Sequence, residues 1–188
     1  MFGVSLLDHL RMTFGHVVFR HKAHSQLARS RAHWSRRLRA AEALLMIGVA
    51  VAATGAAFGK EYVYVIASAV LAVLALATLL LHLTLDLDRS AQAHASSATR
   101  LWQIRERYRA VLSDFSDGAL DLDAVRRRRD ELMVELHGIY ETAPLADGQT
   151  YSTAGLGMAT IDEVALTDEE IDLFLPKSLH KTDKPTAA

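Results

Sequence analysis

The sequence predicts an all-α membrane protein, in which a transmembrane helical hairpin is joined to two long cytosolic helices and a short C-terminal helix. Two uncharged runs, residues 43–59 and 62–85, carry this prediction, and only Lys60 and Glu61 separate them. The whole 188-residue chain has an ordinary composition, with 51% hydrophobic and 23% charged residues. The class therefore follows from where the apolar residues lie and not from how many there are.

Both uncharged runs are long enough to cross a bilayer. At a rise of about 1.5 Å per residue, residues 62–85 span about 36 Å and residues 40–59 about 30 Å, against a hydrocarbon core of about 30 Å. A buried hairpin in a soluble protein is the alternative, but a core helix seldom needs so long a stretch without a charge. In lipid each backbone amide must be hydrogen-bonded within its own segment, so both runs are expected to be helices.

The charges flanking the spans predict the topology. Residues 1–39 carry eight Lys or Arg and one Asp, whereas the turn between the spans offers only Lys60. Basic flanks stay on the cytoplasmic side, so both termini are expected in the cytoplasm, as an even number of spans requires. Residues 1–7 are too short an apolar run for a signal peptide.

Residues 1–39 form a basic N-terminal helical segment with an apolar stripe. Leu7, Leu10 and Phe14 recur at helical spacing. Two interpretations stay open: an amphipathic helix on the anionic inner leaflet, or a cytosolic helix that packs on the rest of the chain. The histidines of this segment fit no zinc-binding spacing, so neither a metal nor a cofactor is expected.

Residues 86–160 predict a cytosolic helical hairpin and a segment of small residues. One helix is expected over residues 86–115, continuous with the second span, and another over residues 122–142, ended by Pro144. Their apolar stripes can be buried on each other or on a neighbouring subunit. The candidates for this packing are Leu101, Trp102, Tyr108, Leu112, Leu132, Leu136 and Tyr140.

Residues 161–188 are expected to form an acidic short helix and a polar tail. Thr167 followed three residues later by Glu170 is a capping-box signal, which predicts a helix through Leu175. The chain after Lys177 is polar and predicts a tail.

Several classes of function are excluded by what the sequence lacks. The chain contains no cysteine, so it has no disulfide framework, thiol nucleophile, thiolate zinc site or iron–sulfur cluster. It also contains no phosphate-binding glycine loop, no zincin motif and no nucleophile elbow. We therefore expect that the protein is not an enzyme.

The chain resembles the SLATT family of small two-span proteins in prokaryotic defence and nucleotide-signalling systems. The resemblance covers roughly residues 25–160. Besides the double span with its minimal turn, it rests on the stretches Trp102–Tyr108, Arg129–Leu132, Tyr140–Pro144 and Tyr151–Ala154.

The resemblance implies a function for the spans. It implies an oligomeric effector in the bacterial inner membrane that forms a gated, depolarising pore in anti-phage defence by abortive infection. It also implies a nucleotide-sensing or nucleotide-producing partner protein, with the lipid bilayer and further copies of the chain as its other partners. The alternative is a membrane anchor that does not conduct and recruits signalling partners through its cytosolic helices.

The spans contain the candidates for pore and gate. The first span has small residues every four positions, which can pack within one hairpin or between subunits, and the resemblance favours subunits. Glu42 and His82 lie near the cytoplasmic mouth, where they can either reach the headgroups or line a cation path. The pore and gate candidates are Glu42, Gly48, Ala52, Thr54, Ala56, Ser68 and His82.

A run of four arginines, Arg126, Arg127, Arg128 and Arg129, suggests an anionic ligand. Four consecutive helical residues point around about 300° of the helix, however, so they form no single patch. Nearby acidic residues can pair with them. We favour ion pairs over anionic-ligand binding, and we do not expect nucleic acid as a partner.

Overall fold

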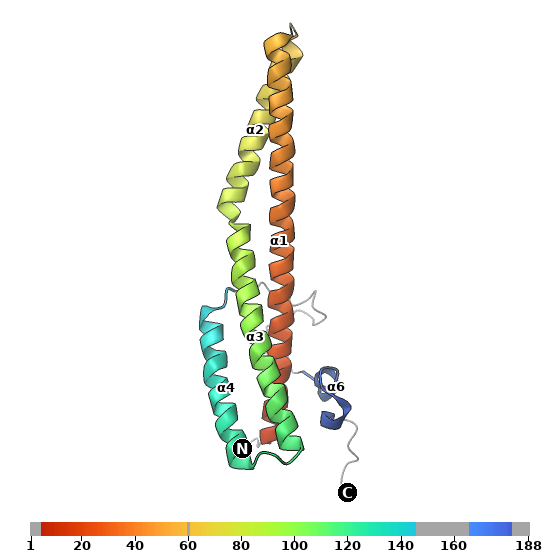
Figure 1. The fold of residues 1–188 in the computed structure, drawn as a ribbon, viewed down its shortest axis with the longest axis vertical. Helices are drawn as coiled ribbons and strands as arrows, with labels where there is room; N and C mark the ends of the chain where they lie inside the picture. The colour runs from red at the N-terminus through yellow and green to blue at the C-terminus, as the bar shows by residue number, and fades with distance from the viewer. Residues whose placement is uncertain (1–4, 60, 146–165, 182–188) are drawn as a thin grey trace. The chain divides into compact units, whose positions relative to one another are not determined.

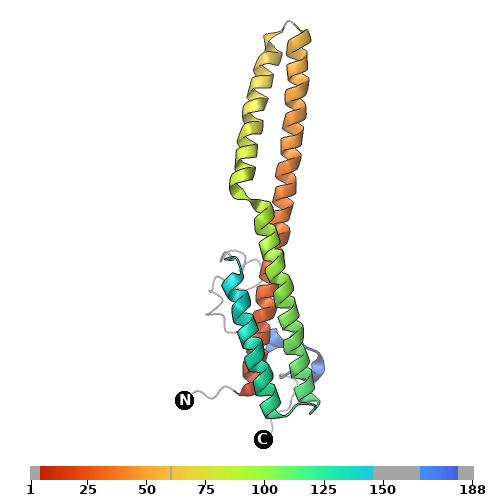
Figure 2. The same ribbon diagram turned by 60° about the vertical axis from the view of Figure 1, so that its left-hand side comes forward.

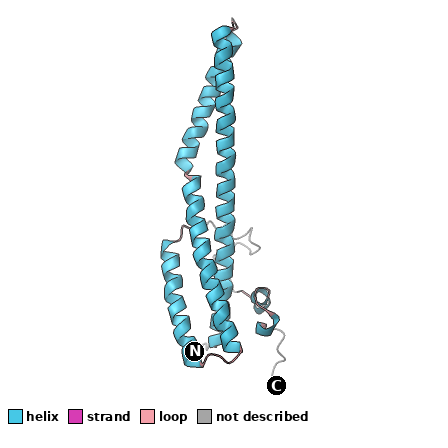
Figure 3. Ribbon diagram, in the orientation of Figure 1, coloured by secondary structure: helices cyan, strands magenta, loops and turns pink. Residues whose placement is uncertain are grey.

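The computed structural model describes residues 5–59, 61–145 and 166–181, and these are helical with short connections. The elements are α1 (Leu6–Phe58), α2 (Tyr62–Leu85), α3 (Leu87–Ser116), α4 (Leu122–Thr142), α6 (Asp168–Asp172) and a 3₁₀ turn at Lys177–Leu179. The described part contains no strand (Figures 1 and 3). Two of its helices are long and apolar enough to cross a membrane. The predicted all-α class with two spans is confirmed.

The chain divides into two compact units, and α1 and α3 contribute to both. The hairpin unit comprises residues 28–92, and the bundle unit comprises residues 1–27 together with residues 93–188.

In the hairpin unit, α1 and α2 run antiparallel beside each other (Figure 2). Only 6% of the apolar window in either candidate span is buried. A core helix of a soluble protein would be mostly covered, whereas a helix in lipid leaves its apolar surface exposed to the acyl chains. The helices come close near the turn, because a Cβ at Gly55 would lie only 2.7 Å from the Cδ1 atom of Tyr64.

The bundle unit buries apolar stripes from the start of α1, from α3 and from α4 in one core. The largest fully buried side chains of this core are Tyr108, Phe14, Leu10, Leu101, Leu112 and Leu132. Of the two interpretations of the N-terminal segment, the structure supports packing on the rest of the chain. A helix lying on the inner leaflet would need Leu10 and Phe14 facing lipid, and both are completely buried.

The second span and the following helix are not continuous, so the prediction of one helix running through Asp86 is wrong. Asp86 has a φ of 41° and a ψ of 47°, the left-handed conformation, and it caps the C-terminus of α2. Aspartate tolerates this conformation better than most residues with a side chain. α3 then begins at Leu87.

Both ends of α4 and the start of α6 follow the sequence signals, but the prediction that the short helix runs through Leu175 is wrong, because α6 ends at Asp172. The side chain of Asp121 caps α4 by accepting from the backbone N–H of Ala124 at 2.6 Å. Thr167 and Glu170 form the predicted capping box at α6. The prediction of a polar tail after Lys177 is wrong for residues 178–181, because the 3₁₀ turn brings Leu179 against the core. The small-residue segment is predicted at residues 145–160, and all of it after residue 145 lies outside the described residues.

Candidate functional site at the base of the hairpin

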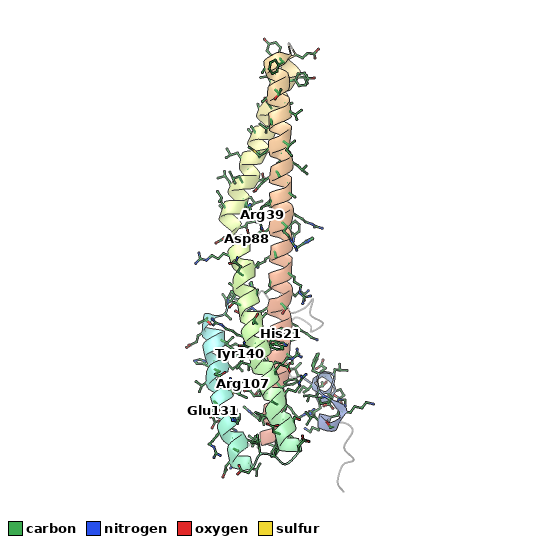
Figure 4. All side chains as sticks on the ribbon, in the orientation of Figure 1. His21, Arg39, Asp88, Arg107, Glu131 and Tyr140 are labelled. Atoms are coloured by element: carbon green, nitrogen blue, oxygen red, sulfur yellow. The ribbon has the colours of Figure 1, made fainter. Side chains whose placement is uncertain are left out.

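Five polar residues converge at the base of the hairpin, the end away from the connection between Phe58 and Tyr62. We call them the base cluster; they are Ser35, Arg39, Glu42, His82 and Asp88. The first three lie at positions i, i+4 and i+7 of α1 and therefore share one face of that helix. Figure 4 labels Arg39 and Asp88, which reach the cluster from α1 and α3.

Glu42 and His82 form the pair that joins the two spans. The Nδ1 atom of His82 lies 3.0 Å from Oε1 and 3.2 Å from Oε2 of Glu42, and each side chain is 19% exposed. The other ring nitrogen, Nε2, lies 3.9 Å from a carboxylate oxygen of Asp88. An imidazole that carries both ring protons can therefore face two carboxylates at once.

Asp88 connects the cluster to the neighbouring turns of α1. Its Oδ1 atom accepts a hydrogen bond from the Ser35 hydroxyl at 2.7 Å and one from the Arg39 guanidinium at 3.0 Å. Ser35 is completely buried, so loss of its partner would leave a buried polar group unsatisfied. The Arg39 pair is exposed, and exposed pairs contribute about 1 kcal/mol or less.

The break at Asp86 positions Asp88. Because α3 starts anew at Leu87, Asp88 stands in its first turn. A carboxylate there is favoured by the partial positive charge of a helix N-terminus. Had the second span run on as one helix, Asp88 would be an interior position with no such advantage.

Two of the predicted site residues, Glu42 and His82, lie together in the base cluster. The sequence analysis does not predict its other members, Ser35, Arg39 and Asp88. Arg39 and Asp88 lie near the predicted ends of the spans, and the spacing of Ser35, Arg39 and Glu42 on one helical face is the signal that could have found the rest of the cluster. Asp88 could be recognised only once the break at Asp86 was known.

The row of small residues in the first span faces α2. A Cβ at Gly48 would lie 3.3 Å from the Cδ1 atom of Leu71, Ala52 is buried, and Ala56 is half-buried. The structure thus shows the small residues of the first span packed against the second span of the same chain. Packing between subunits through the same row stays a prediction.

The hydroxyl groups in the spans bond to their own helices. Thr54 donates to the carbonyl of Ala50 at 2.8 Å, and Ser68 donates to that of Val65 at 2.9 Å. Thr54 is exposed on the hairpin surface and Ser68 is half-buried. Neither contacts the base cluster.

The predicted packing residues of α3 and α4 divide into buried and exposed ones. Those buried in the core of the bundle unit are Leu101, Tyr108, Leu112, Leu132 and Leu136. Tyr140 is half-buried, and the Arg20 guanidinium lies 4.1 Å from its ring centroid. Trp102 is 49% exposed and lines an open groove between α3 and α4, near the ion pair of Arg107 with Glu135. The buried residues pack within one chain, so Trp102 is the member of this set most available to a partner.

The arginine run on α4 is engaged mainly in short-range ion pairs. Arg126 pairs with Asp123 at 3.0 Å, Arg128 with Glu131 at 3.4 Å, and Arg129 with Asp130 at 2.8 Å. These contacts agree with the ion-pair interpretation. As for metals, the described ranges contain no group of three or more His, Asp or Glu side chains that could hold one.

Comparison with known protein families gives a match over most of the chain. The family model described as SMODS and SLOG-associating 2TM effector domain, family 4, matches residues 6–170. The matched range includes both spans, α3, α4 and the start of α6. Neither a curated protein nor a solved structure matches the chain.

Proposed function

The chain belongs to the SMODS and SLOG-associating 2TM effector domain family, as its resemblance to SLATT proteins predicts, and on this basis we propose that it forms a gated pore. Membership makes it a two-span membrane effector domain associated with defence systems. In the proposal, several copies assemble in the bacterial inner membrane. The open assembly depolarises that membrane and stops the growth of an infected cell.

The base cluster is the observation that supports the proposal most. The hairpin is apolar over its exposed sides and gathers Glu42, His82 and Asp88 at one end. One hairpin cannot enclose a path for ions, so a pore needs several copies with these groups around a common mouth. Apolar spans above such a mouth favour a dry, closed resting state, which suits an effector that must stay silent.

In the proposal, this mouth faces the cytoplasm. The basic flanks favour cytoplasmic termini, so the base cluster would face the compartment in which a trigger is produced. That trigger would come from a nucleotide-sensing or nucleotide-producing protein of the same system, in keeping with the family description. A reporter that is active only in the periplasm, fused after Ala188, should remain inactive.

Membrane potential is the direct test of the pore. Induced expression in bacteria together with the cognate trigger should collapse the signal of a potential-sensitive dye. The matched control is a chain with Ala52→Glu, which introduces an unpaired charge into the packed face of the hairpin and should abolish function. An intact potential in the presence of trigger and correctly inserted protein would contradict conduction.

A non-conducting membrane anchor is the second candidate. The observation that favours it is the placement of Gly48 and Ala52 against α2, which uses the small residues of the first span inside the hairpin. An anchor would recruit its partners through the bundle unit. Growth arrest without depolarisation would support this function over the pore.

A further inference from the structure

The bundle unit holds the C-terminal segment of its own chain, residues 166–181, on a surface of α1 and α3 that we call the Arg11 groove. The side chain of Arg11 is only 2% exposed. Its guanidinium donates to the carboxylate of Asp172 and to the carbonyl of Leu179, and it lies 3.7 Å from Asp168. Figure 1 shows α6 beside the first part of α1.

Apolar contacts accompany this buried charge pair. Gly15 leaves room for the segment, because a Cβ there would lie 2.8 Å from the Cδ1 atom of Leu166 and 3.1 Å from Cγ1 of Ile171. Ile171 is 1% exposed, and the Lys22 ammonium lies 4.1 Å from the ring centroid of Phe174. The groove thus recognises an apolar side chain followed directly by a carboxylate.

The rim of the groove adds exposed ion pairs. The Lys181 ammonium lies 2.8 Å from Asp8 and 3.1 Å from Asp168, and its backbone N–H donates to the carboxylate of Asp172 at 3.1 Å. Exposed pairs of this kind add orientation more than affinity. The buried pair of Arg11 with Asp172 is therefore the specific part of the contact.

The segment leaves one hydrogen-bond donor of the groove without an acceptor. The Nε atom of Arg11 is buried and has no hydrogen-bond partner among the described residues. Beside the segment, an open hollow of about 590 Å³ lies against α3 and is lined by Ser113, Phe174 and Leu179 among others. Because a buried donor without a partner is unfavourable, an occupant with one more acceptor in reach of Nε would bind better.

Any occupant that covers Arg11 must supply a counter-ion. A segment that buried Arg11 without a carboxylate would leave a buried charge with no partner, and such a state is strongly disfavoured. Charge complementarity selects an acidic segment, and the apolar floor at Gly15 selects an amphipathic one.

We propose that the Arg11 groove is a docking site for an acidic, amphipathic segment of a partner protein, and that the chain's own C-terminal segment occupies it until it is displaced. The occupant would carry an apolar residue and a carboxylate at the positions of Ile171 and Asp172, with a further apolar residue at the position of Leu175. This binding step does not depend on conduction, so a failure of the pore in the dye experiment leaves it untouched.

A labelled peptide of residues 166–181 is the probe, and its fluorescence anisotropy is measured with the detergent-solubilised full chain. The Asp172→Asn chain loosens its own segment but keeps Arg11, so it should bind the peptide about tenfold more tightly than the unaltered chain or better. A peptide that itself carries Asp172→Asn should bind the Asp172→Asn chain about tenfold more weakly than the unaltered peptide does. Adding Gly15→Leu to the Asp172→Asn chain fills the floor of the groove without altering any charge. This double variant should no longer bind the peptide. Arg29→Met on the exposed surface of α1 is the matched control and should leave binding unchanged.

Two results would overturn the proposal. One is equal peptide affinity for the unaltered and Asp172→Asn chains, and the other is peptide binding that does not depend on the carboxylate of Asp172. A second copy as the occupant is a separate result with its own test. Because the chain has no cysteine, copies carrying Asp8→Cys and copies carrying Lys181→Cys can be co-expressed without background. A disulfide between such copies would assign the groove to self-association and overturn its assignment to a partner protein.

Discussion

The Nδ1 atoms of His24 and His94 lie 3.0 Å apart inside the bundle unit, with 4% and 1% of the two residues exposed. One ring nitrogen must donate and the other accept, so at least one of the two imidazoles is neutral in this arrangement. Burial lowers the pKa of His24 to about 4, and the charges of His94 and Arg20 act in the same direction.

Stability of the bundle unit should therefore fall on acidification. The unfolded chain, with an ordinary histidine pKa near 6.5, binds a proton that the folded chain excludes between pH 6.5 and about 4. The stabilisation is complete above pH 6.5 and is lost towards pH 4, by up to about 3 kcal/mol. Thermal unfolding in detergent across this range measures it. His24→Gln should flatten the dependence, and His137→Gln, at an exposed position of α4, should not.

Tyr108→Phe should stabilise the bundle unit or leave it unchanged. The Tyr108 hydroxyl is buried, and among the described residues it has no hydrogen-bond partner. Burial is also the main reason that the pKa of Tyr108 is raised to about 12. Removing an unsatisfied hydroxyl should raise the free energy of unfolding by about 1 kcal/mol. Tyr108→Leu, which removes most of the ring, is the contrasting variant and should destabilise. A loss of more than about 1 kcal/mol in the phenylalanine variant would mean that the hydroxyl has a partner.

Ser35→Ala should destabilise the hairpin unit, because it deletes the buried donor to Asp88. We expect a loss of about 1–2 kcal/mol in thermal unfolding. Ser30→Ala, at an exposed position of the same helix, is the control and should be neutral. Equal effects of the two variants would argue against the base cluster as a stabilising network.

Ala52→Leu should perturb the contact of the two spans. Ala52 is buried in the hairpin, and additional methylene groups in a packed contact cost about 1–3 kcal/mol. Ala53→Leu, on the exposed side of α1, should insert and unfold normally. If the oligomer size in detergent changes only with Ala53→Leu, the subunits pack through the outer face and not through the row of Gly48, Ala52 and Ala56.

Glu42→Gln should spare assembly and reduce the preference of the pore for cations, because it removes a negative charge from the proposed mouth. The readout is the reversal potential in planar bilayers under a salt gradient. Glu61→Gln, at the other end of the hairpin, is the matched control. The test depends on the proposed pore, and an unchanged reversal potential would place the selective groups elsewhere.

Much of the fold could be predicted because it depends on local patterns. The charge-free runs predict the spans, the capping box predicts α6, and the Asp121 and Pro144 boundaries of α4 follow from its periodicity and its proline. The pairing of Glu42 with His82 could be anticipated because both lie near one end of their spans.

The features that could not be predicted depend on contacts between distant residues or on one backbone angle. Nothing local to Arg11 indicates that Asp172, far away in the sequence, would neutralise it. Asp86 is one aspartate among many, and nothing in the sequence around it indicates its left-handed conformation. Asp88 belongs to the candidate site because this conformation ends α2 and lets α3 begin at Leu87, which puts Asp88 in the first turn of α3.

The break at Asp86 makes the base cluster sensitive to insertions. Each added residue in a helix rotates all later side chains by about 100° relative to the earlier ones. Ser35, Arg39 and Glu42 share one face of an unbroken helix, so an insertion among them would turn part of that face away. His82 and Asp88 flank the irregular residue Asp86, and an insertion there would move Asp88 away from His82 and Ser35. Length variation among relatives should accordingly spare both residues 35–42 and residues 82–88.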